Sequence, residues 1–134
     1  MEVTAEHLGN AKFEVVARGH RVICDQPAEN GGHDSGMTPP EFLLASLATC
    51  AAYYATQYLK ARKLSGDVKV RVTAEKAQQP ARLASFRIQV LTPGLDEKYE
   101  AGVLRAVKAC LIHSTLLGQP TIEVAVNDAI PAEV

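Results

Sequence analysis

The chain has 134 residues, of which 47% are hydrophobic, and its 14 basic and 15 acidic residues leave a net charge of −1. This balance, with no basic run, excludes nucleic-acid binding driven by phosphate neutralisation. No apolar stretch reaches the length of a membrane span, and residues 1–10 are polar and lack a signal-peptide core. We therefore expect one cytoplasmic domain, residues 1–134, that can fold without a disulfide or a metal.

Alternating apolar and polar residues predict two short strands near the start of the chain. In residues 12–17, Phe13, Val15 and Ala17 share one face. A turn at Arg18 and Gly19 then leads into a second strand at residues 21–24. Residues 25–40 are rich in Gly, Pro, Asp and Asn and predict a long loop, a kind of segment that is usually functional.

A long apolar helix is predicted over residues 40–63, because prolines and Glu41 suit its first turn. Its other faces carry mainly small residues, which indicates burial on most sides. Apolar residues recur at steps of three and four and predict the core-facing stripe, formed by Leu43, Leu47, Cys50, Tyr54 and Tyr58.

The second half of the chain predicts an antiparallel hairpin, with strands at residues 68–75 and 84–90. Asp96 is a suitable N-cap for a helix at residues 97–111, and alternation predicts a last strand at residues 121–126. The fold class is therefore α+β, with antiparallel sheets packed on two main helices, the first long and central. The second helix should bury Val103, Leu104, Val107, Cys110 and Leu111.

Three cysteines are too few, and odd in number, for a disulfide scaffold. Cys24 ends a strand and is interpreted as packing, whereas Cys50 and Cys110 lie on the core stripes of the two helices. Buried cysteines often serve as small hydrophobic residues. The alternative is a thiol pair in which one thiolate attacks an electrophile and the other thiol resolves the product.

Two segments resemble the OsmC/Ohr family, proteins of osmotic induction and organic-hydroperoxide resistance. Residues 36–50 read Gly-Met-Thr-Pro-Pro-Glu-Phe-Leu-Leu-Ala-Ser-Leu-Ala-Thr-Cys. Residues 108–123 read Lys-Ala-Cys-Leu-Ile-His-Ser-Thr-Leu-Leu-Gly-Gln-Pro-Thr-Ile-Glu. The separation of 60 positions between the two cysteines and the order of elements also fit, and the likeness extends over residues 12–126.

The resemblance implies an intertwined homodimer with active sites at the subunit interface. It implies reduction of organic hydroperoxides in oxidative-stress defence, with Cys50 as the peroxidatic and Cys110 as the resolving cysteine. The electrons would come from an external dithiol, and no metal or organic cofactor would be needed. An arginine from the N-terminal strands, held by a glutamate, would stabilise the thiolate; Arg18 matches it best and Arg21 is the competitor.

Two positions depart from the family pattern, which indicates an OsmC-like subgroup. The family's glutamate lies ten residues before the first cysteine, where this chain has Pro40, and Glu41 is only nine before Cys50. One step on a helix turns a side chain by roughly 100°. Glu41 therefore either reaches the arginine through a change in the first turn or serves only the helix dipole. Leu111 also stands where the family often has proline.

Other candidates have plainer interpretations. The His33–Asp34 pair in the glycine-rich loop is interpreted as solvated, since a zinc site with Cys24 lacks paired ligands at close spacing. His113 could affect the Cys110 thiol but suits an ordinary helix-end position. Aromatic residues of the first helix could shape an apolar pocket, although such residues are more often core; these are Tyr53, Tyr54 and Tyr58.

Three functions remain open on the sequence. The leading one is a thiol peroxidase acting through Cys50 and Cys110, with Arg18 and Glu41 in support. The alternative is a catalytically weak or inactive OsmC-like protein that binds a small hydrophobic ligand at the dimer interface. The third is an assembly domain with inert buried thiols, which measured thiol reactivity would separate from the first.

Overall fold

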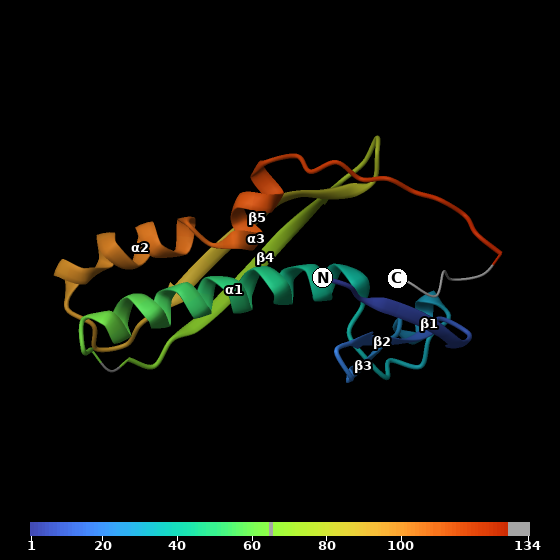
Figure 1. The fold of residues 1–134 in the computed structure, drawn as a ribbon, viewed down its shortest axis with the longest axis horizontal. Helices are drawn as coiled ribbons and strands as arrows, with labels where there is room; N and C mark the ends of the chain where they lie inside the picture. The colour runs from blue at the N-terminus through green and yellow to red at the C-terminus, as the bar shows by residue number, and fades with distance from the viewer. Residues whose placement is uncertain (65, 129–134) are drawn as a thin grey trace.

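The computed structural model describes residues 1–64 and 66–128, which form two antiparallel sheets and three helices (Figure 1). A three-stranded sheet has the order β1-β2-β3, and a two-stranded sheet joins β4 to β5. This is the α+β class that the sequence predicts. In chain order the elements are β1 (Thr4–Gly9), β2 (Lys12–Ala17), β3 (His20–Cys24), a 3₁₀ turn (Ala28–Asn30), α1 (Pro39–Ala61), β4 (Lys69–Ala77), β5 (Arg82–Leu91), a 3₁₀ turn (Glu97–Tyr99), α2 (Glu100–Lys108) and α3 (Leu111–Leu117).

The N-terminal sheet contains the two predicted strands and one that the sequence analysis did not predict. β1 pairs with β2 through main-chain bonds, with Glu6 opposite Glu14, and its polar side chains gave no alternation signal. β2 and β3 are joined by Arg18 and Gly19, whose φ angles are 51° and 81°. Two successive positive φ angles are typical of the tight turn that matches the twist of a hairpin.

The long helix α1 begins one residue before the predicted start and ends two residues before the predicted end. Its first turn is closed by a capping box between Thr38 and Glu41. The Thr38 main-chain N–H donates to Glu41 Oε1 at 3.0 Å, and the Glu41 N–H donates to Thr38 Oγ1 at 3.4 Å. Two of the unpaired donors at the helix start are thereby satisfied.

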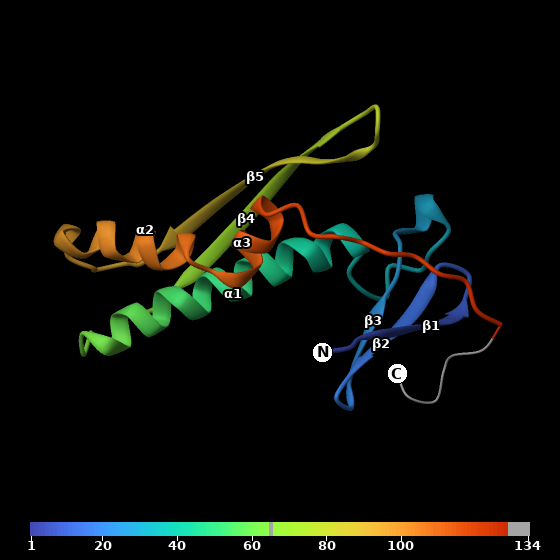
Figure 2. The same ribbon diagram turned by 45° about the horizontal axis from the view of Figure 1, so that its top comes forward.

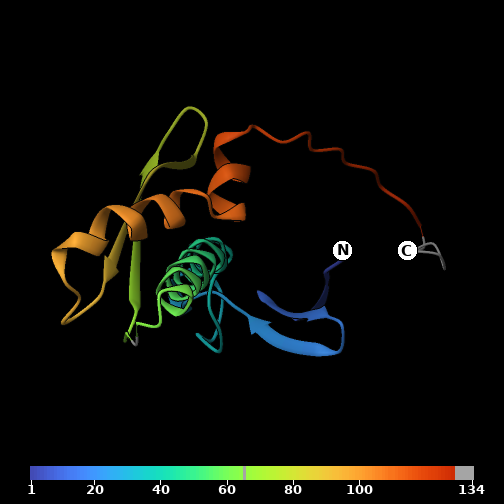
Figure 3. The same cartoon turned by 60° about the vertical axis from the view of Figure 1, so that its left-hand side comes forward.

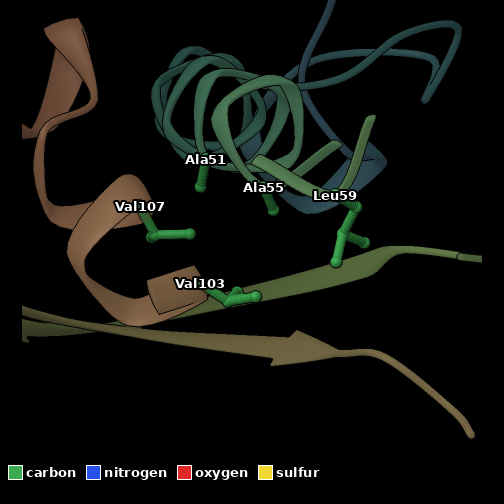
Figure 4. Packing of buried hydrophobic residues seen from close by; sticks show 5 residues of the cluster. All are labelled: Ala51, Ala55, Leu59, Val103 and Val107. Carbon is green, nitrogen blue, oxygen red and sulfur yellow. The ribbon is translucent and has the colours of Figure 1, made fainter. Parts of the chain in front are cut away.

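The core of the helical body lies on a face of α1 that only partly overlaps the predicted one. Ala51, Ala55 and Leu59 of α1 point toward Val103 and Val107 of α2 (Figure 4). Leu47 of the predicted stripe is buried as expected, but beyond it the buried row runs one residue later than predicted. Alanines on the buried face let α1 approach α2 closely, whereas the larger residues of the predicted stripe are only half-buried or exposed, namely Leu43, Cys50, Tyr54 and Tyr58.

The second predicted helix is broken into pieces. Asp96 caps as expected, accepting from the Lys98 N–H at 3.0 Å, but α2 ends at Lys108 and Cys110 takes an extended conformation, with ψ at 135°. A separate helix, α3, then begins at Leu111. Of the predicted core stripe, Val103, Val107 and Cys110 are buried, whereas Leu104 and Leu111 are 55% and 60% exposed.

The predicted last strand is not formed within the described residues. Residues 119–128 run out from α3 toward the end of the molecule that carries the N-terminal sheet (Figure 1 and Figure 2). The alternating side chains of this C-terminal arm, Ile122, Val124 and Val126, are 81%, 88% and 96% exposed. A strand needs an edge to pair with, and the arm pairs with neither of the two described sheets.

The two sheets lie at opposite parts of the molecule. β4 and β5 pack against α1 and α2, whereas the N-terminal sheet stands beside the first turns of α1 without covering the helices (Figure 3). Within the described residues, no helix is long and apolar enough to cross a bilayer.

Candidate functional site

The fold brings Cys50 and Cys110 close enough for each thiol to shift the pKa of the other. Cys50 lies in the middle of α1 and is half-buried, whereas Cys110 lies in the break between α2 and α3 and is completely buried. Both are free thiols. The break that ends α2 turns the chain so that the first amides of α3 face the Cys50 sulfur.

The environment of Cys50 favours its thiolate. Burial alone would raise the pKa of the Cys50 thiol, but the net shift is downward. Hydrogen bonds from the Cys110 thiol and from the main-chain N–H groups of Ile112 and Leu111 stabilise the negative charge and lower the pKa. A lowered pKa makes a cysteine more nucleophilic at neutral pH because more of it is thiolate.

Cys110 is shifted in the opposite direction. Burial raises the pKa of the Cys110 thiol, and its hydrogen bond to Cys50 and the charge of that thiolate raise it further. The main-chain N–H groups of His113 and Ile112 oppose this rise without reversing it. The pair is therefore asymmetric, with Cys50 the readier thiolate and Cys110 the protonated donor.

The candidate arginine lies away from this pair in the described chain. Arg18 is exposed at the tip of the β2–β3 hairpin, and within the described residues its side chain makes no hydrogen bond or ion pair. Its competitor Arg21 is engaged with Glu14, at 2.6 Å between Nη1 and Oε1. Of the two, Arg18 is the one available to a further partner.

Glu41 is committed to the start of α1 through one carboxylate oxygen. Both the main-chain N–H and the hydroxyl of Thr38 donate to its Oε1, at 3.0 and 2.9 Å. These bonds lower the pKa of the Glu41 carboxyl. The alternative of a role at the helix start, left open by the sequence, therefore corresponds to a real contact, while Oε2 takes no hydrogen bond from the described residues.

A buried carboxylate that the sequence analysis missed organises the glycine-rich loop. Asp25 is fully buried and its Oδ2 accepts from the Ser35 hydroxyl at 2.5 Å and from the Ser35 and His33 N–H groups at 3.1 Å each. The Ser35 hydroxyl is the main cause of a strong lowering of the Asp25 pKa. Gly32 is required here, because a Cβ would lie 1.9 Å from the Gln26 carbonyl oxygen.

The remaining candidates take supporting positions. The His33 side chain is exposed, and its contribution to the loop is its main-chain N–H. Cys24 is buried, and burial followed by the Asp25 charge raises the pKa of its thiol. Tyr53 is 61% exposed, while Tyr58 packs against Gly102. Among residues 1–64 and 66–128, no three His, Cys, Asp or Glu side chains are grouped as metal ligands.

Two apolar grooves follow β5 and share part of their lining. The larger, of about 570 Å³, lies between β5 and α2, and the smaller, of about 360 Å³, reaches α1 and α3. The grooves share Phe86, Ile88 and His113, and Leu47 of α1 lines the smaller one. Apolar walls of this kind suit a molecule with a hydrocarbon part.

Comparison with known proteins gives the same fold. The family described as "OsmC-like protein" matches residues 32–125, and no curated protein matches the chain. A putative osmotic stress induced and detoxification response protein from Psychrobacter arcticus aligns with a TM-score of 0.77 at 19% identity, over 84% of this chain and 85% of its own. An organic hydroperoxide resistance protein OsmC from Legionella pneumophila aligns with a TM-score of 0.62 at 21% identity, over 87% and 88%. At such identities the likeness establishes the fold.

Proposed function

The chain belongs to the OsmC-like family, and from that premise we propose that it is a thiol peroxidase that reduces organic hydroperoxides in oxidative-stress defence. The observation that carries the proposal is the asymmetric pair of thiols. Cys50 receives hydrogen bonds from Cys110 and from two main-chain amides that lower its pKa, and Cys110 is held next to it with a raised pKa. Peroxidatic chemistry needs a thiolate, and its sulfenic acid condenses with a second thiol beside it.

The first step follows from this arrangement. The Cys50 thiolate attacks the outer oxygen of the hydroperoxide R–O–OH, so that an S–O bond forms and the O–O bond breaks. The sulfur is oxidised to a sulfenic acid and the peroxide is reduced to an alkoxide. The Cys110 thiol, which lies within reach and is protonated, supplies the proton that releases the alcohol ROH.

The second step closes the cycle. The Cys110 thiolate left by the first step attacks the Cys50 sulfenic acid, forming a disulfide and expelling hydroxide, which takes up a proton from solvent as water. An external dithiol then reduces the disulfide and is itself oxidised. The amides of Leu111 and Ile112, which stabilise the first thiolate, remain in place for the next turnover.

We also propose that the working unit is an intertwined homodimer. The chain exposes 10358 Å², whereas a compact monomer of 14.4 kDa exposes about 6,800 Å². The C-terminal arm presents an alternating segment that forms no strand, and the N-terminal sheet leaves Val22 and Phe13 exposed. A second copy would supply the missing edge and cover these faces.

Within such a dimer, the exposed Arg18 of one chain is the cation that would stand beside Cys50 of the other. Glu41 would hold it through Oε2 while Oε1 remains in the capping box. A guanidinium next to the sulfur would add to the stabilisation of the thiolate that the amides provide.

The test is a thiol count on the reduced protein before and after one equivalent of cumene hydroperoxide, followed by peptide mapping. The proposal predicts rapid loss of two thiols and a disulfide between Cys50 and Cys110, with Cys24 still free. If no thiol is lost over minutes while a general alkylating reagent still reacts with Cys50, the proposed peroxidase activity is contradicted.

A second function has one observation in its favour. The apolar grooves along β5 could hold a small hydrophobic ligand without any chemistry at the thiols. Unreactive cysteines together with a hydrophobic molecule retained through purification, identified by mass spectrometry of the extracted protein, would support this alternative.

A further inference from the structure

The larger groove along β5 is apolar over most of its length. Its walls are formed by side chains of β5, of α2 and of the segment between them, among them Ile88, Val90, Leu95 and Leu104. Its volume of about 570 Å³ is typical of pockets that hold small organic molecules. Hydrocarbon displaces water from such walls favourably, so the groove suits a molecule with an apolar body.

The charged side chains of this groove lie at its two ends. Helix α2 lines the groove from Glu100, its first residue, to Lys108, its last. The rise of an α-helix separates these two positions by about 12 Å, which is the length of an extended hydrocarbon chain of roughly ten carbons. Apart from the ring of His113, Glu100 and Lys108 are the ionisable groups of the lining. The groove is therefore acidic at one end and basic at the other.

Lys108 is the cation that this groove offers to an anionic group. Among residues 1–64 and 66–128 the one ion pair joins Arg21 to Glu14, so the Lys108 ammonium has no acidic partner in the described chain. A carboxylate is attracted to this ammonium and repelled by the Glu100 carboxylate at the other end. A ligand with one carboxylate would therefore place it next to Lys108 and extend its apolar part toward Glu100.

We propose that the larger groove binds a medium-chain carboxylate, paired with Lys108 and with its hydrocarbon chain lying between β5 and α2. The site is separate from the reactive thiols, because neither Cys50 nor Cys110 is part of the lining. It goes beyond the peroxidase activity, and it gives a chemical class to the hydrophobic ligand considered as the second function.

Isothermal titration calorimetry of the full-length reduced protein at neutral pH tests this site, with decanoate, octanoate and decanol as probes. Decanoate has two more CH₂ groups to bury than octanoate and should bind about tenfold more tightly. Lys108→Gln should weaken the binding of decanoate about fivefold and leave that of decanol within about twofold of wild type.

Two neighbouring positions on α2 supply a disrupting variant and its matched control. Leu104 lines the groove and is 55% exposed, so Leu104→Glu adds a charge beside the ligand without opening the core. This variant should weaken the binding of decanoate at least about tenfold. Arg105 is exposed and does not line the groove, so Arg105→Gln removes a nearby cation and should leave the affinity within about twofold.

Several outcomes would overturn the inference. These are the absence of saturable binding of decanoate, equal affinities of wild type and Lys108→Gln, and an equal loss in Arg105→Gln, which would indicate general attraction of anions. If decanoate does not bind and Leu104→Glu instead dissociates a dimer in light scattering, a second copy covers the groove. The thiol count with cumene hydroperoxide does not depend on these titrations, so failure of this site and failure of the peroxidase are distinguishable.

Discussion

A single chain completes the packing of the helical body but not that of the N-terminal sheet. In the body, α1, α2 and the β4–β5 hairpin close a core around Ala51, Ala55 and Val107. In the N-terminal sheet, β1 is exposed along almost its whole length and Val22 is 44% exposed. The helical body therefore has a closed hydrophobic core. The N-terminal sheet has its main-chain hydrogen bonds but lacks a second layer packed on it.

This difference separates the parts of the candidate site. The thiol pair is built inside the body, where α1 meets the break before α3, so one chain is sufficient to place it. Arg18 belongs to the unfinished sheet, where nothing in the described chain holds it. Reactivity of the thiols and support by the arginine should therefore respond separately to mutation.

The largest expected effect comes from the body. Cys50→Ser should abolish peroxide consumption, a loss of at least about a thousandfold, because a serine hydroxyl is not ionised at neutral pH. Cys110→Ser should still consume one equivalent of peroxide and then stop with a sulfenic acid on Cys50. A dimedone adduct detected by mass spectrometry measures this difference.

Cys24→Ser is the control for both variants, because Cys24 is buried next to Asp25 and takes no part in the proposed chemistry. Undiminished turnover in Cys50→Ser would show that the pair is not catalytic. The thiol chemistry assigned to the helical body would then be wrong, although the difference in packing between the two regions would stand.

The next effect tests whether the unfinished region is completed by a second copy. Val124→Glu places a charge on the alternating face of the C-terminal arm, and burial of an unpaired charge is strongly unfavourable. We expect a dimer dissociation constant raised at least about a hundredfold, measured by light scattering after gel filtration. Ala125→Glu adds the same charge on the opposite face and should change assembly much less. Equal behaviour of the two variants would exclude the arm as an interface strand.

The contrast between the regions also explains which parts of the structure the sequence could predict. Alternation located β2, β4 and β5, and the prolines and glutamate at residues 39–41 located the start of α1, because these signals are local. The pairing of the C-terminal arm could not be read in the same way. Its alternation is real, but the arm joins neither sheet of the described residues.

The details of the site were less predictable for physical reasons. The buried face of α1 is formed largely by alanines, and a helix with small residues on several sides has no single apolar stripe. No glycine or proline at the break near Cys110 marks the end of the helix in the sequence. Asp25 is a single carboxylate in an irregular loop. Its role in the loop depends on hydrogen-bond donors that lie eight and ten residues further along the chain.

A third prediction concerns the connection between the N-terminal sheet and the helical body. Asp25 stabilises this connection by fixing the loop between β3 and α1. Asp25→Asn replaces an acceptor that takes several hydrogen bonds, and we expect Tm to fall by roughly 10 °C. Because the folded-state pKa of Asp25 is lowered, its stabilisation is present above its ordinary value of 3.8 and is lost as pH falls through the folded-state pKa. The difference in Tm between variant and wild type should therefore be full at pH 7 and shrink in strong acid.

Asp34→Asn is the matched control for this prediction. Asp34 is in the same loop, but its side chain is exposed, and asparagine tolerates its positive φ of 54°. A similar fall in Tm for both variants would show that loop composition, rather than the buried carboxylate, joins the two regions.

The smallest effect on stability is expected at Glu41, where the two regions would meet in the dimer. Glutamine can replace glutamate in a capping box, so Glu41→Gln should keep Tm within about 2 °C of wild type, whereas Glu41→Ala should lower it by about 3 °C. The lowered pKa of Glu41 means that its charged form stabilises the fold above its ordinary value, and this contribution is lost as pH falls through the folded-state pKa.

The oxidation rate of Cys50 separates the two roles of Glu41. If its Oε2 holds Arg18 of a second copy, Glu41→Gln should slow the reaction with cumene hydroperoxide by roughly three- to tenfold with little loss of stability, and Arg18→Gln should match it. The double variant should then be no slower than either single one, because both changes remove the same interaction. Additive losses would mean that the two residues act apart. Unchanged rates with a lower Tm in Glu41→Ala would assign Glu41 to the helix start alone and leave thiolate stabilisation to the amides of α3.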